Sequence, residues 1–301
     1  MVVVNPEIGR FDEQIPSGPS GKEQSTGKGQ VKAMIPGIST NAEARLTGVL
    51  DPRVTDIAED SFAARDYTIL DASDEDAKRL GVQCTGGGVT LVVTDPTRRL
   101  GDIRVQSAGR DNTLFFDNLA WGGNCYATIR MLGSDTVMLF NDIGDEYVSM
   151  QDIYLRSNGQ FVFWGRGASA VGISMEIEGE GVGVVIGDDA LISNGVWIRN
   201  HDMHAIHDLR TGTRINRPPV QTVLERHVWL GHDAMLLATE RVGTGAIVGT
   251  RALVKGTVPP RVVVAGTPAR VIREGVSWGR SNNGMTDAER SAIGLPELPE
   301  T

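Results

Sequence analysis

The sequence predicts an all-β solenoid, in which the chain winds through stacked coils of parallel strands. Glycine provides 37 of the 301 residues, well above the average of about 7%, which indicates many turns between short strands. An apolar triplet recurs at near-constant spacing between residues 91 and 186, and an aliphatic residue recurs every six positions from 224 onward. Helices repeat every 3.6 residues and strands every two, so a period of six predicts one flat face of a triangular coil.

The apolar triplets form the first half of this pattern. They begin at Leu91, Leu114, Val137, Phe161 and Val184, so the steps between them are nearly equal. One short strand per repeat predicts stacked rungs. The alternative is a β-sandwich, whose strands usually recur every 8–12 residues.

The hexads form the second half. The aliphatic first positions are Leu224, Leu230, Leu236, Val242, Val248 and Val254, and the same register appears upstream at Ile186, Ile192 and Ile198. We expect these side chains to point inward, with three hexads making one full coil. The small or β-branched fifth residues, expected near the corners, are Val228, Ala234, Ala246, Ala252 and Val258.

The segments outside the repeats divide the chain into an N-terminal extension (1–80), the coil (81–275) and a tail (276–301). Residues 1–48 are rich in Gly, Ser, Pro and Lys, which predicts weak order. The stretch 73–81 predicts a short helix that Gly81 ends. Thr286 with Glu289 three positions later predicts a capping box for a helix in the tail.

Composition excludes several classes of function. The net charge of −9 argues against a general nucleic-acid binder. The N-terminus lacks the features of a signal peptide and the chain has no apolar run long enough to cross a bilayer, so we expect a cytoplasmic protein without a membrane span. Cys84 and Cys125 form no CxxC pair, so a disulfide framework is not expected.

An interruption of the hexads holds most of the candidate chemistry. The register stops at Ile198 and resumes at Leu224. Counted against one full coil of three hexads, this gap contains eight extra residues and predicts a loop insertion near 199–222. All five histidines lie in or just after it, at His201, His204, His207, His227 and His232. Loops carried on a rigid scaffold are common positions for functional residues.

Residues 184–273 resemble the hexapeptide-repeat acyltransferases. The closing "VAGTPARVIR" (264–273) is similar to the usual end of that family's repeat. More narrowly, Asp202-x-His204-x-Ile206 followed by "RINRPP" and "HVWLG" resembles O-acetyltransferases of bacterial capsular and extracellular polysaccharides. The resemblance implies a left-handed parallel β-helix, acetyl-CoA as acyl donor, a carbohydrate acceptor, and a homotrimer with active sites between subunits.

Acetyl transfer to a hydroxyl needs a base, and histidine suits this role because its ordinary pKa lies near neutral pH. We predict His204 as the general base, because it occupies the histidine of the D-x-H-x-I motif. A carboxylate can orient such a ring, and Asp202 or Asp208 is the candidate. The predicted substrate-binding residues are His201, His207 and Trp229, while His227 and His232 are expected to be structural.

Coenzyme A needs a narrow slot for its pantetheine arm and cations for its phosphates. The candidates for the slot and the phosphate contacts are Gly231, Gly249, Thr250, Arg251, Lys255 and Arg270.

Three alternatives remain open at this point. A zinc enzyme like the γ-carbonic anhydrases would use His227 and His232 with His201 or His204. A non-catalytic β-helix would only bind glycans, and an N-acetyltransferase would act on an amino sugar. Trp121 and Trp164 are predicted to pack inside the protein rather than to stack on sugars.

Overall fold

A computed structural model describes residues 68–216 and 221–296, which all lie within one compact unit. The stretch predicted to be weakly ordered, 1–48, lies outside the described residues. The predicted helix is present as α3 (Glu75–Arg79). Gly81 follows at φ 92°, and a Cβ there would lie 1.8 Å from the Gly101 carbonyl oxygen, so this stop requires glycine.

The N-terminal part of the coil contains one long and one short strand per turn. The long strands pair in parallel in the order β2 (Val82–Thr85), β4 (Gly101–Ser107), β6 (Cys125–Met131), β8 (Val148–Leu155) and β10 (Ser169–Ile177). The short strands pair in the order β3 (Val89–Val93), β5 (Asn112–Phe116), β7 (Val137–Phe140), β9 (Phe161–Trp164) and β11 (Gly183–Ile186). The predicted stacked rungs are therefore confirmed, and β1 (Thr68–Asp71) adds an antiparallel edge to β3.

The register of the short strands differs by one residue from the alignment of triplets at two steps. Leu114 pairs with Met138 rather than Val137, and Val184 pairs with Val162 rather than Phe161. In a half-exposed strand, alternation of apolar and polar residues identifies the register. These strands are buried along their whole length, so their sequences lack that alternation.

The C-terminal part of the coil has three short strands per turn. Leu230 pairs with Val248 and Leu236 with Val254, so the partners stand three hexads apart, as predicted. The inward-pointing first positions of the hexads are buried. The strands are β12 (Leu191–Ile192), β13 (Val196–Arg199), β14 (Thr222–Leu224), β15 (Trp229–Leu230), β16 (Met235–Val242), β17 (Ile247–Val248), β18 (Leu253–Val258) and β19 (Val262–Ala265), after which β20 (Arg270–Glu274) pairs antiparallel with β19.

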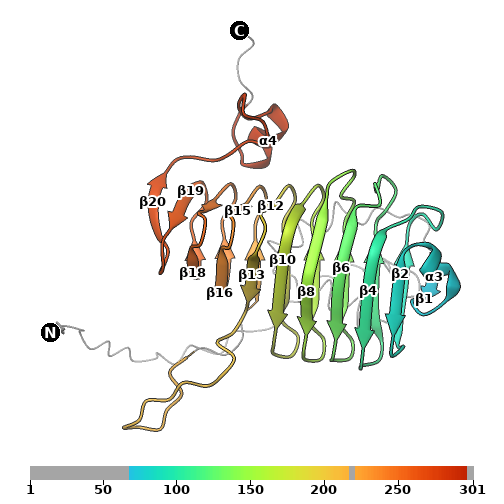
Figure 1. Cartoon of the computed structure of the whole chain (residues 1–301). Helices are drawn as coiled ribbons and strands as arrows, with labels where there is room; N and C mark the ends of the chain where they lie inside the picture. The colour runs from blue at the N-terminus through green and yellow to red at the C-terminus, as the bar shows by residue number, and fades with distance from the viewer. Residues whose placement is uncertain (1–67, 217–220, 297–301) are drawn as a thin grey trace, which may run out of the picture. The chain divides into compact units, whose positions relative to one another are not determined.

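The coil has the predicted left hand. Figure 1 shows β4, β6, β8 and β10 in front with their arrowheads pointing down, while the residue number rises toward the left. The chain returns behind these strands before each next one begins. Advancing leftward while descending in front and rising behind is a left-handed path, so the prediction of a left-handed parallel β-helix is confirmed.

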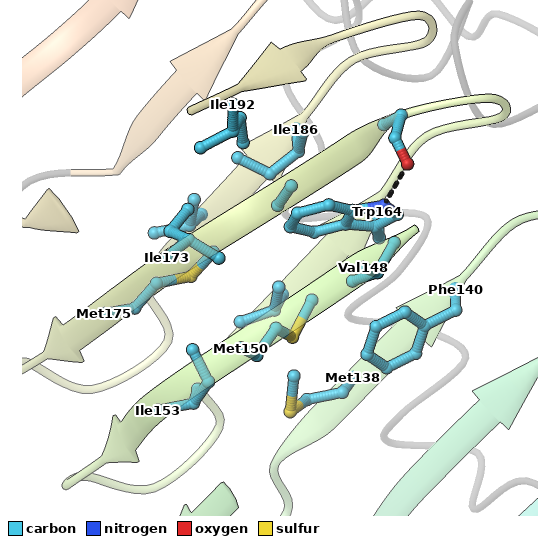
Figure 2. Close-up of a cluster of buried hydrophobic side chains, with 14 of the residues drawn as sticks. Met138, Phe140, Val148, Met150, Ile153, Trp164, Ile173, Met175, Ile186 and Ile192 are labelled. Carbon is cyan, nitrogen blue, oxygen red and sulfur yellow. Dashed lines mark hydrogen bonds between the residues drawn. The ribbon is translucent and has the colours of Figure 1, made fainter. Parts of the chain in front are cut away.

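The interior is filled by apolar side chains from successive coils. Figure 2 shows Met138, Phe140, Trp164 and Ile186 directed into this shared core. The indole N–H of Trp164 donates to the Ala168 carbonyl at 3.0 Å, which satisfies its one polar group. Trp164 and Trp121 are both fully buried, which confirms their predicted packing role.

The insertion is longer than predicted. Ile198 pairs with Leu236, whereas partners in a regular coil, such as Leu236 and Val254, stand three hexads apart. The separation of Ile198 and Leu236 exceeds that of a regular coil by twenty positions, and not by the eight predicted. The prediction compared the gap with a full coil, whereas the gap replaces only the single face between β13 and β14.

The longer insertion also places Trp197 and Trp229 on different faces of the coil. Trp197 pairs with Met235, while Trp229 pairs with Ile247 on another face of the coil.

The tail returns to the coil. Its helix α4 (Asp287–Ala292) begins with the predicted capping box between Thr286 and Glu289. Before it, the Trp278 ring stacks on the buried His227 ring, with centroids 4.1 Å apart. The Arg280 guanidinium donates to Asp189 at 2.7 Å. Across the residues that the structure describes, no helix has the length and apolar character needed to cross a membrane.

Candidate active site

The inserted segment leaves the coil after β13 as a hairpin-shaped loop, as Figure 1 shows, and one isolated antiparallel bridge joins His207 and Arg214. The Ile215 N–H donates to the Ile206 carbonyl at 2.8 Å, and the Asp208 N–H donates to the Thr213 carbonyl at 2.9 Å. At the tip, the Asp208 carboxylate accepts hydrogen bonds from the backbone N–H groups of Arg210 and Thr211. Asp208 thus stabilises the turn, which makes Asp202 the better placed of the two candidate carboxylates.

Asn216 closes the root of this hairpin. Its Oδ1 accepts from the Ile206 N–H and from Arg214 Nε, both at 2.9 Å. Its Nδ2 donates to the His204 carbonyl at 2.9 Å and to Asp202 Oδ2 at 3.3 Å. Sequence reasoning did not single out Asn216, although it stands inside the "RINRPP" motif that carries part of the resemblance.

Asp202 anchors the hairpin root to the coil. Lys255 Nζ, on β18, lies 3.1 Å from Asp202 Oδ1. Burial alone would raise the pKa of the Asp202 carboxyl, but the hydrogen bonds from Lys255 and Asn216 outweigh burial and lower it. The Asp202 carboxylate is therefore ionised at neutral pH. The backbone carbonyl of the same residue accepts a hydrogen bond from the His204 N–H at 2.8 Å.

His201 is buried beneath this turn, with 3% of its surface exposed. Its Nδ1 accepts a hydrogen bond from the Met203 N–H at 2.9 Å. Met203 has φ 66°, a left-handed conformation that is rare for a residue with its side chain. Burial lowers the pKa of His201, despite the carboxylate of Glu178 at 3.1 Å, and the neutral ring keeps the Nδ1 lone pair that Met203 uses.

His204 directly follows this constrained residue and is exposed on the hairpin. His207 is also exposed, and it forms an isolated bridge with Arg214 across the hairpin. The predicted base therefore emerges from a turn that His201, Asp202 and Asn216 fix by hydrogen bonds. His207 has only the regular backbone of the hairpin to place it.

Two cavities flank the hairpin root, and Asp202 lines both. The first has a volume of about 500 Å³ and lies against the coil corner, lined by Asp202, Ile206, Ile215, Asn216, Ala238, Lys255 and Gly256. The second has about 280 Å³ and lies toward the N-terminal coils, lined by Ser157, Glu178, Gly179, Glu180, His201, Asp202, Met203, Ala205 and Arg214.

The residues predicted to bind coenzyme A divide between two places. Gly231 and Gly249 occupy equivalent corners of successive coils, and a Cβ on Gly231 would lie 2.8 Å from the Thr250 nitrogen. Thr250 and Arg251 follow at that corner, and Arg270 pairs with Ala265 of β19. Lys255 lies at the hairpin root instead, paired with Asp202.

The other histidines have structural surroundings. His227 is fully buried, with Nδ1 2.6 Å from Asp189 and Nε2 2.8 Å from the Trp278 carbonyl oxygen. Both ring nitrogens are therefore engaged, which leaves no lone pair for the zinc site of the carbonic-anhydrase alternative. His232 is exposed beside Asp233, and nowhere in 68–216 or 221–296 do three His, Cys, Asp or Glu side chains converge as metal ligands.

Trp229 lies on β15, half-buried, with its indole nitrogen 3.5 Å from the Ser193 hydroxyl. The Trp278 ring of the tail is 6.1 Å away. Trp229 thus belongs to a different face of the coil from β13, where the hairpin begins.

Comparison with known proteins relates this chain to acetyltransferases. WbbJ of Escherichia coli (strain K12), named for O-acetyl transfer in lipopolysaccharide biosynthesis, is 29% identical over 147 residues, which cover 40% of this chain and 75% of that protein. The polysialic acid O-acetyltransferase of Escherichia coli O1:K1 / APEC is 29% identical over 126 residues, 42% of this chain and 40% of that protein. Among solved structures, the polySia specific acetyltransferase NeuO is 22% identical, with a TM-score of 0.45, over 64% of this chain and 85% of that one. No family model matches the chain.

The coil defines the architecture, a parallel β-helix. The sequence is similar to O-acetyltransferases, and the resemblance to hexapeptide-repeat acetyltransferases predicted from its motifs is confirmed. The second alignment spans less than half of the relative's own length, so the acceptor and the assembly are taken up as proposals.

Proposed function

We propose that this protein transfers an acetyl group from acetyl-CoA to a hydroxyl of a carbohydrate, with His204 as general base. The observation that carries the proposal is the hairpin root, where Asn216 and Asp202, which both line a cavity of about 500 Å³, hydrogen-bond to the backbone of His204. The names of the relatives, which are O-acetyltransferases of lipopolysaccharide and polysialic acid, support a saccharide acceptor.

In this mechanism the His204 imidazole removes the proton of the acceptor hydroxyl as its oxygen attacks the thioester carbonyl carbon. The new C–O bond gives a tetrahedral oxyanion, which needs a hydrogen-bond donor such as a backbone N–H. The C–S bond then breaks, and the imidazolium returns the proton to the departing thiolate. Histidine can perform both steps because its ordinary pKa lies near the working pH.

Asp202 acts through position and charge. Its carboxylate stays ionised because Lys255 and Asn216 hydrogen-bond to it. This ionised carboxylate ties the hairpin root, from which His204 extends, to the coil. Lys255 donates a hydrogen bond to this anion, and the phosphate contact predicted for Lys255 stays a prediction.

We propose further that the active form is a homotrimer with sites between subunits. The hairpin exposes three large apolar side chains, Ile206, Leu209 and Ile215, and Leu209 is 101% exposed. Clustered exposed apolar groups favour an interface. The corner of Gly231 and Gly249 lies on another face of the coil than the hairpin, so a neighbouring subunit would bring the donor slot to His204.

The test is acetyl transfer by the purified protein from acetyl-CoA to a panel of neutral, acidic and amino-sugar polysaccharides. The expected product is an ester, so the acetyl group on the polymer should be released by mild alkali. An alkali-resistant acetyl group would instead establish N-acetylation. If the protein binds a glycan but releases no free coenzyme A from acetyl-CoA with any acceptor, the non-catalytic alternative would be supported.

A further inference from the structure

Nδ1 of His201 faces two groups that make opposite demands on it. It accepts a hydrogen bond from the Met203 N–H at 2.9 Å, and it lies 3.1 Å from Oε2 of Glu178. An imidazole nitrogen accepts a hydrogen bond only through a free lone pair, and once protonated it can only donate. Nδ1 can therefore hold Met203 while it is unprotonated, and it can pair with Glu178 when it carries a proton.

The neutral form of this ring is held by a single hydrogen bond. When Nδ1 accepts from Met203, the one ring proton sits on Nε2. Within residues 68–216 and 221–296, the buried Nε2 has no hydrogen-bond partner. Protonation of Nδ1 would therefore exchange one neutral hydrogen bond for one between opposite charges, which is the stronger kind.

Charged groups from several elements surround the ring. Burial is the largest influence, and it lowers the pKa of His201 below the ordinary value of 6.5. The carboxylates that favour the protonated ring are Glu176 of β10, Glu178 and Asp202, and the guanidinium groups that oppose it are Arg156 and Arg199. These opposed charges leave the protonated ring accessible as the pH falls.

We propose that His201 and Glu178 form an acid-sensitive switch for the turn that leads into His204. The neutral ring holds Met203 in its left-handed conformation, at φ 66°, which is costly for a residue with a Cβ. On protonation, Nδ1–H donates to the Glu178 carboxylate, the Met203 N–H loses its acceptor, and the backbone that leads into His204 is released. A titrating histidine that biases a two-state element is the general basis of pH switches.

Proton linkage sets the direction of the switch. Because the closed turn lowers the pKa of His201, the released turn binds the proton more readily than the closed turn does. The closed turn therefore has its full stability above the ordinary pKa of 6.5. It loses stability as the pH falls from that value through the lowered pKa.

NMR of the full-length protein, labelled with ¹⁵N in methionine and histidine, tests the switch. The His201 ring and the Met203 amide should titrate together, with a midpoint below 6.5. Exchange of the Met203 amide, corrected for its intrinsic dependence on pH, should rise at least about threefold between about pH 7.5 and about pH 5. Both responses should persist in His204→Ala, which removes the neighbouring ring. A Met203 amide that does not follow the His201 ring would overturn the proposal.

Two glutamate variants separate this pair from general effects of acid. Glu178→Gln removes the anion that receives the proton of Nδ1, so the common midpoint should move to lower pH. Glu180→Gln is the matched control, because Glu180 is exposed on the same cavity, and it should leave the midpoint unchanged. A midpoint that stays in place in Glu178→Gln, or that moves equally in both variants, would overturn the proposal.

The consequence for acetyl transfer rests on the proposed function of His204. His201→Asn supplies an acceptor that does not titrate. The fraction of kcat that remains at about pH 5.5, relative to about pH 7.5, should therefore be at least about threefold larger in His201→Asn than in the wild type. Equal fractions would overturn this consequence. Absence of transfer in every variant would count against the proposed function and leave the NMR result standing.

Discussion

At the scale of single residues, the site is organised around the left-handed conformation of Met203. This conformation costs a residue with a Cβ about 1–2 kcal/mol, and such strain concentrates at functional sites. Here it is held by the His201 ring beneath and the Asp202 carbonyl beside it. We therefore propose that His201 positions this turn, while the substrate contact predicted for it stays a prediction.

Replacing His201 tests this role. An asparagine side chain can accept the N–H two residues later, as in an Asx-turn, so His201→Asn should keep acetyl transfer within about threefold. His201→Leu fills the space without an acceptor and should lower kcat by about tenfold to a hundredfold, because small misplacements are costly in catalysis. Equal losses in both variants, at equal thermal stability, would contradict the positioning role.

Lys255 sets the titration of Asp202. Its hydrogen bond helps to lower the pKa of this carboxyl, so Lys255→Met should raise it, as measured by carbon NMR of the Asp202 side chain. Because the pKa of Asp202 is lower in the folded state, its ionisation stabilises the fold at pH values above the ordinary pKa of 3.8. This stabilisation is lost as the pH falls through the folded-state pKa. Lys255 is half exposed, so the loss of stability at pH 7 should stay below about 1 kcal/mol. An unchanged Asp202 pKa would show that the ion pair is weak in solution.

At the scale of elements, the hairpin depends on one amide. Asn216 joins both strands of the hairpin and its root, and each hydrogen bond contributes about 0.5–1.5 kcal/mol. Asn216→Leu should therefore speed hydrogen exchange across 201–216 by at least about tenfold and reduce acetyl transfer.

Thr213→Ala is the control for this change, because its backbone N–H and carbonyl remain available to the hairpin. It should leave both exchange and transfer near wild type. A hairpin that stays protected in Asn216→Leu would mean that the strands alone maintain it.

Much of the coil was predictable because repetition leaves a strong signal. The aliphatic hexad positions point inward as expected, and the capping box of Thr286 and Glu289 forms as its spacing predicts. The register of β7 and β11 was not predictable, because both faces of these strands are buried and their sequences do not alternate.

The site was predictable only in part. His204 and Asp202 come from a recognisable motif, and the structure brings their backbones together. The contacts of Asn216 depend on the path of a long insertion, which no local pattern specifies. His201 looked like a second ligand in a histidine cluster, and only its burial and its bond to Met203 distinguish it from His204.

At the scale of the whole molecule, the proposed trimer makes a direct prediction. One chain has a mass of 32.3 kDa, so light scattering after size exclusion should give about 97 kDa, as a closed threefold assembly requires. Leu209→Glu, at the fully exposed tip of the hairpin, should shift the protein toward smaller species and lower its activity. A monomeric wild type with full activity would contradict sites between subunits.

The central claim is that His204 is the base, and the rate of acetyl transfer by His204→Ala tests it most directly. General base catalysis contributes about 10²–10⁴-fold, so kcat should fall by that factor, with the fold and the oligomeric state unchanged. His207→Ala, three residues along the same exposed hairpin, should remain within about threefold of wild type. A His204→Ala protein that keeps more than about a tenth of the wild-type kcat would contradict the account.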